Sequence, residues 1–204
     1  MLGNTIFRKP FAGALSLAEG YKDYSSLGTL LYAPLPLVDY KVQPYGDEST
    51  DSEDRNKEDE KFFAQLRAEA PAFIRQVRDT LFEDGMDNPP IERVRAYISE
   101  AKYVTMCWLY ELYSCHQEDK CLLSGLLRII AATTEHDDFN ILLPMVKVCL
   151  CDHSAEVQEA AIMVIEEWRT RECLTALQSA RIDNPCINQY AQDVIEELQA
   201  ELSE

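Results

Sequence analysis

The last quarter of the chain carries one pattern of apolar and polar positions twice. Between residues 152 and 202, apolar side chains recur at steps of three and four, the spacing of one face of an α-helix. The first copy comprises Val157, Ala160, Ala161, Val164, Ile165 and Trp168, and the second, thirty residues later, comprises Ile187, Tyr190, Ala191, Val194, Ile195 and Leu198. The sequence Val-Ile-Glu-Glu occurs in both, at 164–167 and at 194–197. The pattern predicts helices over 154–168 and 186–201, with a shorter helix over 171–181 between them.

A capping residue precedes each copy. Ser154 stands before Ala155, and Asn184 stands before Pro185. A side-chain oxygen at this position accepts hydrogen bonds from the free amides of the first turn, and proline at the first helical position gives up only an amide that has no partner. A helix pair repeated at a period of about thirty residues is typical of an α-solenoid, in which each pair buries its apolar face on the next.

The same spacing predicts five further helices upstream, over 57–69, 71–83, 89–114, 120–133 and 139–151. Pro71 either bends one helix or begins the second of these, and Asn88 with Pro89 marks the start of the third. The range 89–114 is long for a globular helix, so a kink is expected near Lys102. The expected buried stripe of 71–83 is Phe73, Ile74, Val77 and Leu81, and that of 139–151 is Ile141, Leu142, Met145, Val148 and Cys149.

The run Cys-Asp-His-Ser-Ala-Glu-Val-Gln-Glu-Ala-Ala, residues 151–161, resembles the first helix of a short-type HEAT repeat. In that family a small polar or acidic residue precedes the helix, a valine follows the first turn, and an alanine pair permits close helix contact. The second copy is less faithful, since Tyr190 replaces the first alanine and Leu198 replaces Trp168. The resemblance implies an all-α protein that forms a short HEAT-like solenoid of stacked antiparallel helix pairs. It also implies that the protein binds other molecules, as members of that family commonly do. It carries no catalytic motif.

Residues 1–45 differ in kind, because glycine and proline recur and disfavour helix. The apolar run 30–38 contains Pro34 and Pro36, so it is expected to be extended or polyproline-like. The preferred interpretation is an extended N-terminal arm that folds back on the first helices; docking on another molecule and a loose tail are the alternatives. If the arm docks, the candidate partner-binding residues are Tyr32, Leu35, Leu37, Tyr40 and Tyr45.

Residues 46–60 contain no apolar side chain, eight acidic residues and two basic ones. Such a segment cannot offset the entropy of being ordered, so a flexible acidic linker is expected, with a helix beginning near its end. The predicted organisation is therefore an arm at 1–45, a linker at 46–60 and a helical HEAT-like domain at 61–204.

The formal net charge is −17, and residues 61–204 hold twenty-five acidic against thirteen basic side chains. A nucleic-acid ligand would need clustered Lys and Arg to neutralise phosphates, so the charge disfavours it. A basic protein partner fits better, with Glu166, Glu167, Glu196 and Glu197 as further candidate partner-binding residues; solubility alone would also explain the charge. These carboxylates could act as general acid and base only if they lay in a pocket.

The seven cysteines form no Cys-x-x-Cys pair, which favours reduced thiols and a cytoplasmic location. Pro10 and Gly13 interrupt the only run near the start that resembles a signal peptide, and no stretch approaches the roughly 20 apolar residues of a membrane span. Two groups of residues contain the side-chain types that bind zinc. They are Cys149, Cys151 and His153, and Cys115, His116 and Cys121. Neither has the spacing of a tetrahedral site, so no metal, cofactor or catalytic residue is expected.

The function expected from the sequence is a non-enzymatic, intracellular protein–protein interaction module, such as an adaptor or an immunity-like inhibitor that covers a basic surface. The alternatives are a HEAT-like enzyme, related to bilin lyases or DNA glycosylases by fold alone, and a structural subunit of a larger assembly.

Overall fold

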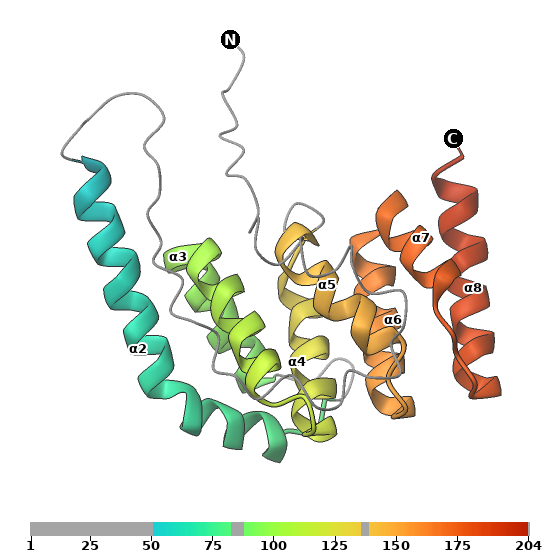
Figure 1. Ribbon diagram of the computed structural model, residues 1–204, viewed down its shortest axis with the longest axis horizontal. Helices are drawn as coiled ribbons and strands as arrows, with labels where there is room; N and C mark the ends of the chain where they lie inside the picture. Colours follow the sequence, from blue (N-terminus) through green and yellow to red (C-terminus); the bar gives the residue numbers. More distant parts are fainter. Residues whose placement is uncertain (1–50, 83–87, 136–138, 204) are drawn as a thin grey trace, which may run out of the picture. The chain divides into compact units, whose positions relative to one another are not determined.

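The computed structural model describes residues 51–82, 88–135 and 139–203. Within these ranges the chain forms seven α-helices and no strand, which confirms the all-α class (Figure 1). The helices are α2 (Asp51–Asp79), α3 (Pro89–Cys115), α4 (Lys120–Thr133), α5 (Phe139–Leu150), α6 (Ala155–Trp168), α7 (Arg171–Ser179) and α8 (Pro185–Glu201). The chain divides into two compact units, Met1–Ser52 and Glu53–Glu204, and only the second is described nearly throughout.

The helix bounds agree with the predicted ones to within two residues from α3 onward. The first helix differs, because α2 is a single helix of 29 residues where two helices were predicted. Pro71 lies inside α2 and bends it without ending it, and the ribbon of α2 is visibly curved in Figure 1. Residues on both sides of the proline, such as Leu66 and Phe73, are buried, so packing offsets the lost hydrogen bond. The helix also begins at Asp51, within the segment 46–60 that was expected to be mostly flexible.

The kink expected near Lys102 occurs at the preceding residue. Ala101 has φ −150° and ψ 82°, an extended conformation that interrupts α3. The second half of the helix can therefore change direction, and it buries Val104, Trp108, Leu109 and Leu112.

Among the helices whose first turn and preceding residue are both described, three have side-chain caps. Asn184 Oδ1 accepts from the N–H of Cys186 at 2.9 Å, as the sequence predicts, Asp119 caps α4 through the N–H of Leu122, and Thr170 caps α7. The prediction for Ser154 is wrong in its detail: Ser154 occupies the N-cap position of α6, but its side chain makes no capping hydrogen bond.

Four pairs of sequence neighbours pack together among the described helices, α3 with α4, α5 with α6, α6 with α7 and α7 with α8, and helices two places apart pack as well. The contact between α4 and α6 is the most extensive, and α6 in turn packs on α8, while α3 packs on α5 and α5 on α7. All six stripe positions of α6 are buried, including Ala160, Ala161 and Trp168. In α8 the match is partial, since Ala191, Val194, Ile195 and Leu198 are buried whereas Ile187 and Tyr190 are half-buried.

Two predicted core positions are wrong. Leu81 is 81 % exposed, because α2 ends at Asp79 and the chain has left the helical path before this residue. Val148 is 59 % exposed, because the buried face of α5 is turned by about one residue from the predicted stripe. That face instead contains Leu143, Val146 and Leu150, in addition to the correctly predicted Leu142, Met145 and Cys149.

Candidate functional site

The predicted acidic pairs lie near the C-terminal ends of α6 and α8, two helices in contact with each other. Glu167 and Glu196 are exposed, whereas Glu166 is half-buried. The Tyr190 hydroxyl of α8 donates to Glu166 of α6, and burial together with this bond raises the pKa of Tyr190 well above its usual value. Tyr190 therefore stays protonated and connects the two helices instead of serving in acid–base chemistry.

Arg169 connects the turn after α6 to α8. Its Nη2 lies 2.7 Å from Glu197 Oε1, and its Nε donates to Glu201 Oε2 at 2.6 Å. These hydrogen bonds hold the pKa of Arg169 above its usual range. Arg169 is also the one residue in the described ranges, glycine apart, with positive φ, at 50°, a left-handed conformation that usually favours glycine. Within the predicted set, Glu197 is thus neutralised locally, while Glu167 and Glu196 make no hydrogen bond or ion pair with other described residues.

The other predicted partner-binding residues, Tyr32, Leu35, Leu37, Tyr40 and Tyr45, lie outside the described residues. The interpretation of residues 1–45 as an arm therefore stays a prediction.

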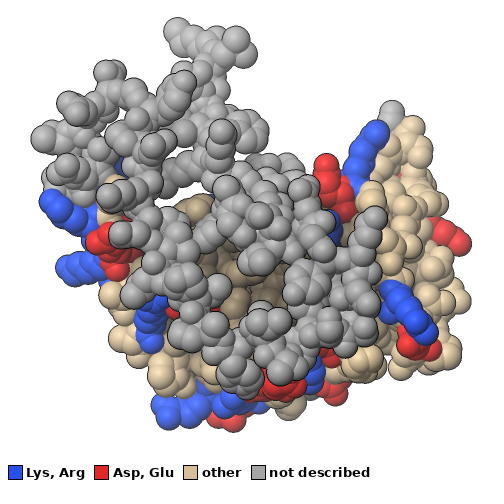
Figure 2. Space-filling view, viewed as in Figure 1, with Lys and Arg blue, Asp and Glu red and all other residues tan. Residues whose placement is uncertain are grey.

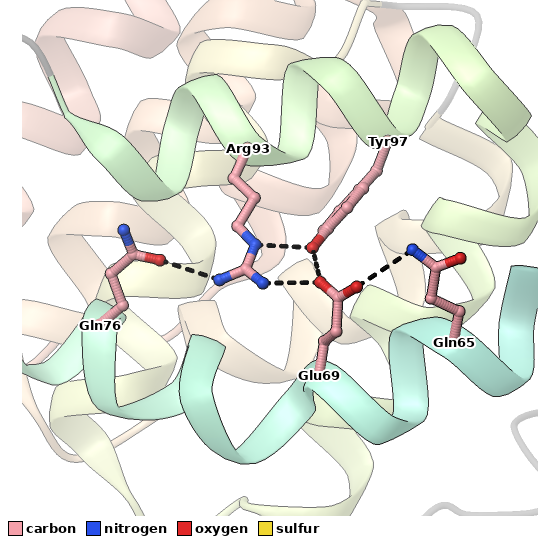
Figure 3. A network of polar contacts seen from close by, with 5 residues as sticks. All are labelled: Gln65, Glu69, Gln76, Arg93 and Tyr97. Atoms are coloured by element: carbon pink, nitrogen blue, oxygen red, sulfur yellow. Dashed lines mark hydrogen bonds and ion pairs between the residues drawn. The ribbon is translucent and has the colours of Figure 1, made fainter.

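A polar network that the sequence did not reveal joins α2 to α3 (Figure 3). Glu69 of α2 accepts from three side chains: Arg93 Nη2 at 2.6 Å, Gln65 Nε2 at 3.1 Å and the Tyr97 hydroxyl. Arg93 also donates through Nε to the Tyr97 oxygen at 2.6 Å and through Nη1 to Gln76 Oε1 at 3.3 Å. The dashed contacts in Figure 3 connect the five side chains into one cluster.

The protonation states of this network suit a structural role. The hydrogen bonds from Tyr97, Arg93 and Gln65 hold the pKa of Glu69 below its usual value, and burial, with the bond to Glu69, raises the pKa of Tyr97. Glu69 is therefore ionised and Tyr97 protonated at neutral pH, so neither is suited to proton transfer there. The network instead fixes how α2 lies on α3, next to the contact between Phe73 and Trp108, whose ring centroids are 4.9 Å apart.

A shallow hollow of about 460 Å³ lies between α2 and α3. Its apolar lining includes Pro71, Ile74, Trp108 and Leu112. Its polar lining consists of Arg67, Arg78, Glu111, Cys115 and His116. Arg67 is occupied by a bidentate pair with Glu111, with Nη2 to Oε1 at 2.6 Å, and Arg78 pairs with Asp119. The Trp108 indole nitrogen is the one buried side-chain donor in the described ranges with no acceptor.

The cysteine and histidine clusters do not converge. Cys149 is buried, and burial raises the pKa of its thiol to about 12, whereas Cys151 and His153 are exposed. Cys115 and Cys121 are exposed as well. None of the seven cysteines is in a disulfide. Among the described residues, no three His, Cys, Asp or Glu side chains lie close enough together to bind a metal ion.

Charged side chains of both signs are visible around the described part of the surface in Figure 2. They are not evenly shared between helices. Along α2 the exposed residues from 55 to 79 include six basic side chains, Arg55, Lys57, Lys61, Arg67, Arg75 and Arg78, and three acidic ones, Glu58, Glu60 and Asp79. α8 contains no basic residue and four acidic ones, Asp193, Glu196, Glu197 and Glu201. None of the described helices is both long and apolar enough to cross a membrane.

Comparisons with known protein families, with curated proteins and with solved structures find no match to this chain. The fold and the site geometry are therefore the basis for the functional argument.

Sequence reasoning missed the α2–α3 network because its members belong to two helices and its hydrogen bonds join residues up to 28 positions apart. Tyr97 lies among the buried apolar residues of α3, and the periodic pattern contains no information about the partner of its hydroxyl. A usable signal existed: Glu69 and Arg93 carry opposite charges beside the buried stripes of two helices that are adjacent in sequence.

Proposed function

We propose that this chain is a non-enzymatic protein-binding module built as a short HEAT-like α-solenoid. The packing of α4 on α6 and α6 on α8, with α3 on α5 and α5 on α7, supports the solenoid, since each helix meets its equivalent in the next pair. The outer face of α8 is polar, as expected of a repeat whose outer side meets solvent. Stacked helix pairs present a continuous surface on which a partner can lie.

The observation that carries the function is the exposed acidic surface at the ends of α6 and α8. Glu167 and Glu196 are exposed and have no counter-ion among the described residues, although Arg169 lies close by. An uncompensated carboxylate surface attracts a complementary basic surface and accelerates encounter with it. The proposed partner is a protein with a basic patch, in the manner of an adaptor or an immunity-like inhibitor, inside the cell.

Nothing in the described region favours catalysis. The Glu166 and Glu69 carboxylates are each occupied by hydrogen bonds from neighbouring side chains. Glu167 lines a hollow of about 400 Å³ together with Trp168 and Arg169, but this hollow is open to solvent. A general acid or base needs a perturbed pKa near its working pH and a place for substrate beside it. The proposal therefore assigns no catalytic residue and no cofactor.

Affinity capture from native lysate, with mass spectrometry, tests this proposal. The baits are the full-length protein, the double variant Glu167→Lys/Glu196→Lys, and the matched control Glu58→Lys/Glu60→Lys on the exposed face of α2. We expect basic proteins to be captured by the wild type and the control and lost with the double variant. Purified partner then binds the wild type at least tenfold more tightly than the variant. Capture of the same proteins by all three baits contradicts the assignment of this surface.

A further inference from the structure

A hollow of about 400 Å³, open to solvent, lies where α4 and α6 end. Its lining consists of two residues that follow α4 and four at the junction of α6 and α7: Thr134, Glu135, Glu167, Trp168, Arg169 and Thr170. The Trp168 indole Nε1 donates to Thr134 Oγ1 at 2.8 Å, and this buried hydrogen bond joins the two helix ends. The hollow is therefore built by two helices that pack on each other.

Both helix ends already bind guanidinium groups of this chain. Backbone carbonyl groups in the last turn of a helix have no partner within the helix. In the last turn of α4, the Ala132 oxygen accepts from Arg95 Nη2 at 3.2 Å. In the last turn of α6, the Glu166 oxygen accepts from Arg169 Nη1 at 3.4 Å. The ends that form the hollow thus offer acceptors that an arginine side chain can reach.

Acidic side chains outnumber basic ones around this hollow. Two carboxylates line it and three more lie beside it: Glu135, Glu167, Glu166, Glu197 and Glu201. Two guanidinium groups offset part of this charge, those of Arg169 and Arg171, and a third, that of Arg95, is paired with Glu92. Glu167 is exposed and makes no hydrogen bond or ion pair with another described residue. The hollow therefore has an excess of negative charge and a carboxylate without a donor.

The start of α7 also borders the hollow, and free amide groups there would favour an anion. Thr170 takes two of them. Its hydroxyl oxygen accepts from the N–H of Cys173 at 3.1 Å, and its carbonyl oxygen accepts from the N–H of Leu174 at 3.0 Å. The start of α7 therefore offsets the negative charge of Glu135 and Glu167 only in part.

We propose that this hollow binds the guanidinium group of an arginine on the basic partner, an inference that rests on the proposed function. A guanidinium group has five N–H donors in a planar fork, so it can bind the Glu167 carboxylate and a carbonyl group of a helix end at the same time. A lysine ammonium has three donors on one atom and is less suited to acceptors that lie apart. Because the hollow is open to solvent, a side chain on the surface of a partner can enter it.

Titration of the full-length, ¹⁵N-labelled protein with the peptide acetyl-Gly-Arg-Gly-amide, at about 0.15 M salt, tests this inference. The chain contains two tryptophans, so its NMR spectrum has two indole N–H signals. Trp168 lines the hollow, whereas Trp108 packs on Phe73 in the core and serves as an internal control. We expect the Trp168 signal to shift until it saturates and the Trp108 signal to stay in place. A Trp168 signal that the arginine peptide does not move overturns the inference.

Two matched peptides identify the group that is recognised. In the citrulline peptide a neutral urea replaces the guanidinium group, so binding should weaken by about tenfold, because the hydrogen bonds to the carboxylate lose their charge. The lysine peptide keeps the charge but lacks the fork, and it should bind about threefold more weakly. Equally tight binding of either control peptide overturns the assignment to a guanidinium group.

Two single variants locate the site. Glu167→Gln removes the carboxylate that lacks a partner and should weaken binding of the arginine peptide by about tenfold. Glu196→Gln is the matched control, because it removes the same charge from an exposed position outside the lining, and it should leave peptide binding unchanged. Both side chains are exposed, so both variants should melt as the wild type does. Equal weakening by the two variants would assign the effect to net charge and overturn the site.

Capture from lysate separates this inference from the proposed function. Capture of a basic protein by a chain whose Trp168 signal does not respond to the arginine peptide would overturn the role of the hollow and leave the proposed function standing. Binding of the arginine peptide in the hollow, with no basic protein captured, would contradict the proposed function and leave the guanidinium site standing.

Discussion

Ala161 shows how strongly the stability of the fold can depend on one small buried residue. It is fully buried in α6, the helix with the most extensive packing in the described chain, and it follows a second buried alanine, Ala160. An Ala161→Glu substitution places a carboxylate in a position that is fully buried within the apolar core. We expect the free energy of unfolding to fall by about 3–5 kcal/mol, measured by urea denaturation.

The matched control for Ala161→Glu is Glu159→Ala, two residues away in the same helix. Glu159 is half-exposed, and its one ion pair, with Arg128, is long at 3.5 Å. Its removal should change the unfolding free energy by less than about 0.5 kcal/mol. Equal effects of the two substitutions would show that Ala161 does not lie in a tight helix contact.

Gly125 lets α4 approach the end of α2. A Cβ atom at this position would lie 2.5 Å from Val77 Cγ1 and 3.1 Å from the ring of Phe82. Alanine has the higher helix propensity, by about 1 kcal/mol, but overpacking a buried contact costs about 1–3 kcal/mol, and Val77 is buried and cannot move freely. Gly125→Ala should therefore lower stability by about 1 kcal/mol in thermal or urea unfolding.

A second substitution identifies the cause of that loss. In a Val77→Ala background, Cγ1 is absent, so Gly125→Ala should no longer cost stability and should gain from its helix propensity. A penalty of the same size in both backgrounds would exclude the steric explanation.

At the scale of the helix, the α2–α3 network makes stability depend on pH. Because the pKa of Glu69 is lowered in the folded chain, first by the bond from Tyr97, its contribution is present above the unfolded pKa of about 4.3 and is lost as the pH falls through the lower folded value. Glu69→Gln should cost about 1 kcal/mol at pH 7, since the network is partly exposed, and the difference from wild type should shrink below pH 4.5.

Urea unfolding at pH 7 and at pH 4 measures this effect. Tyr97→Phe should reduce the cost of Glu69→Gln, because the two residues share a hydrogen bond. Glu58→Gln, an exposed change in the same helix, should have little effect at either pH. A Glu69→Gln penalty that is the same at both pH values would contradict the role assigned to the ionised carboxylate.

Helix content and most of the core could be predicted from the sequence, because burial on one side imposes the 3.6-residue period. The stripe of α6 is a clear case, with every predicted position from Val157 to Trp168 buried. Val148 shows where prediction from hydrophobic periodicity fails. Because α5 is apolar on nearly all sides, its sequence contains little information about which side faces the core. Pro71 shows another limit, since only the packing around Leu66 and Phe73 decides that a helix continues through a proline.

The candidate site was less predictable than the core. The pattern located Glu167 and Glu196 on exposed helix surface, because they flank the stripes, but it could not foresee that Arg169 would turn toward Glu197 and Glu201. That contact depends on the left-handed turn at Arg169 and on how α6 lies against α8. The hydrophobic period of the sequence predicts neither the left-handed turn nor the position of α6 on α8, since both arise from tertiary packing.

At the scale of the whole molecule, acidic side chains greatly outnumber basic ones. Like charges repel in a compact chain, and a net charge of −17 lowers the stability of the folded state at low salt. Salt acts in two opposite directions, because it also weakens surface ion pairs such as Lys120 with Asp152, whose atoms are 2.7 Å apart. Each such pair contributes only about 0–1 kcal/mol, and pairs in contact are screened less than charges separated by tens of ångströms.

Repulsion should therefore outweigh the ion pairs, and sodium chloride should stabilise this protein. We expect the melting temperature of dilute wild type to rise by roughly 3 °C or more between 0.01 and 0.15 M, given about 2–4 °C per kcal/mol for a chain of this size. Potassium chloride should act equally, since screening depends on ionic strength and not on the identity of the ion. The variant Glu167→Lys/Glu196→Lys has a smaller net charge, so its melting temperature should respond less to salt. A melting temperature that falls with added salt would mean that the ion pairs, and not the net charge, dominate the electrostatics of the fold.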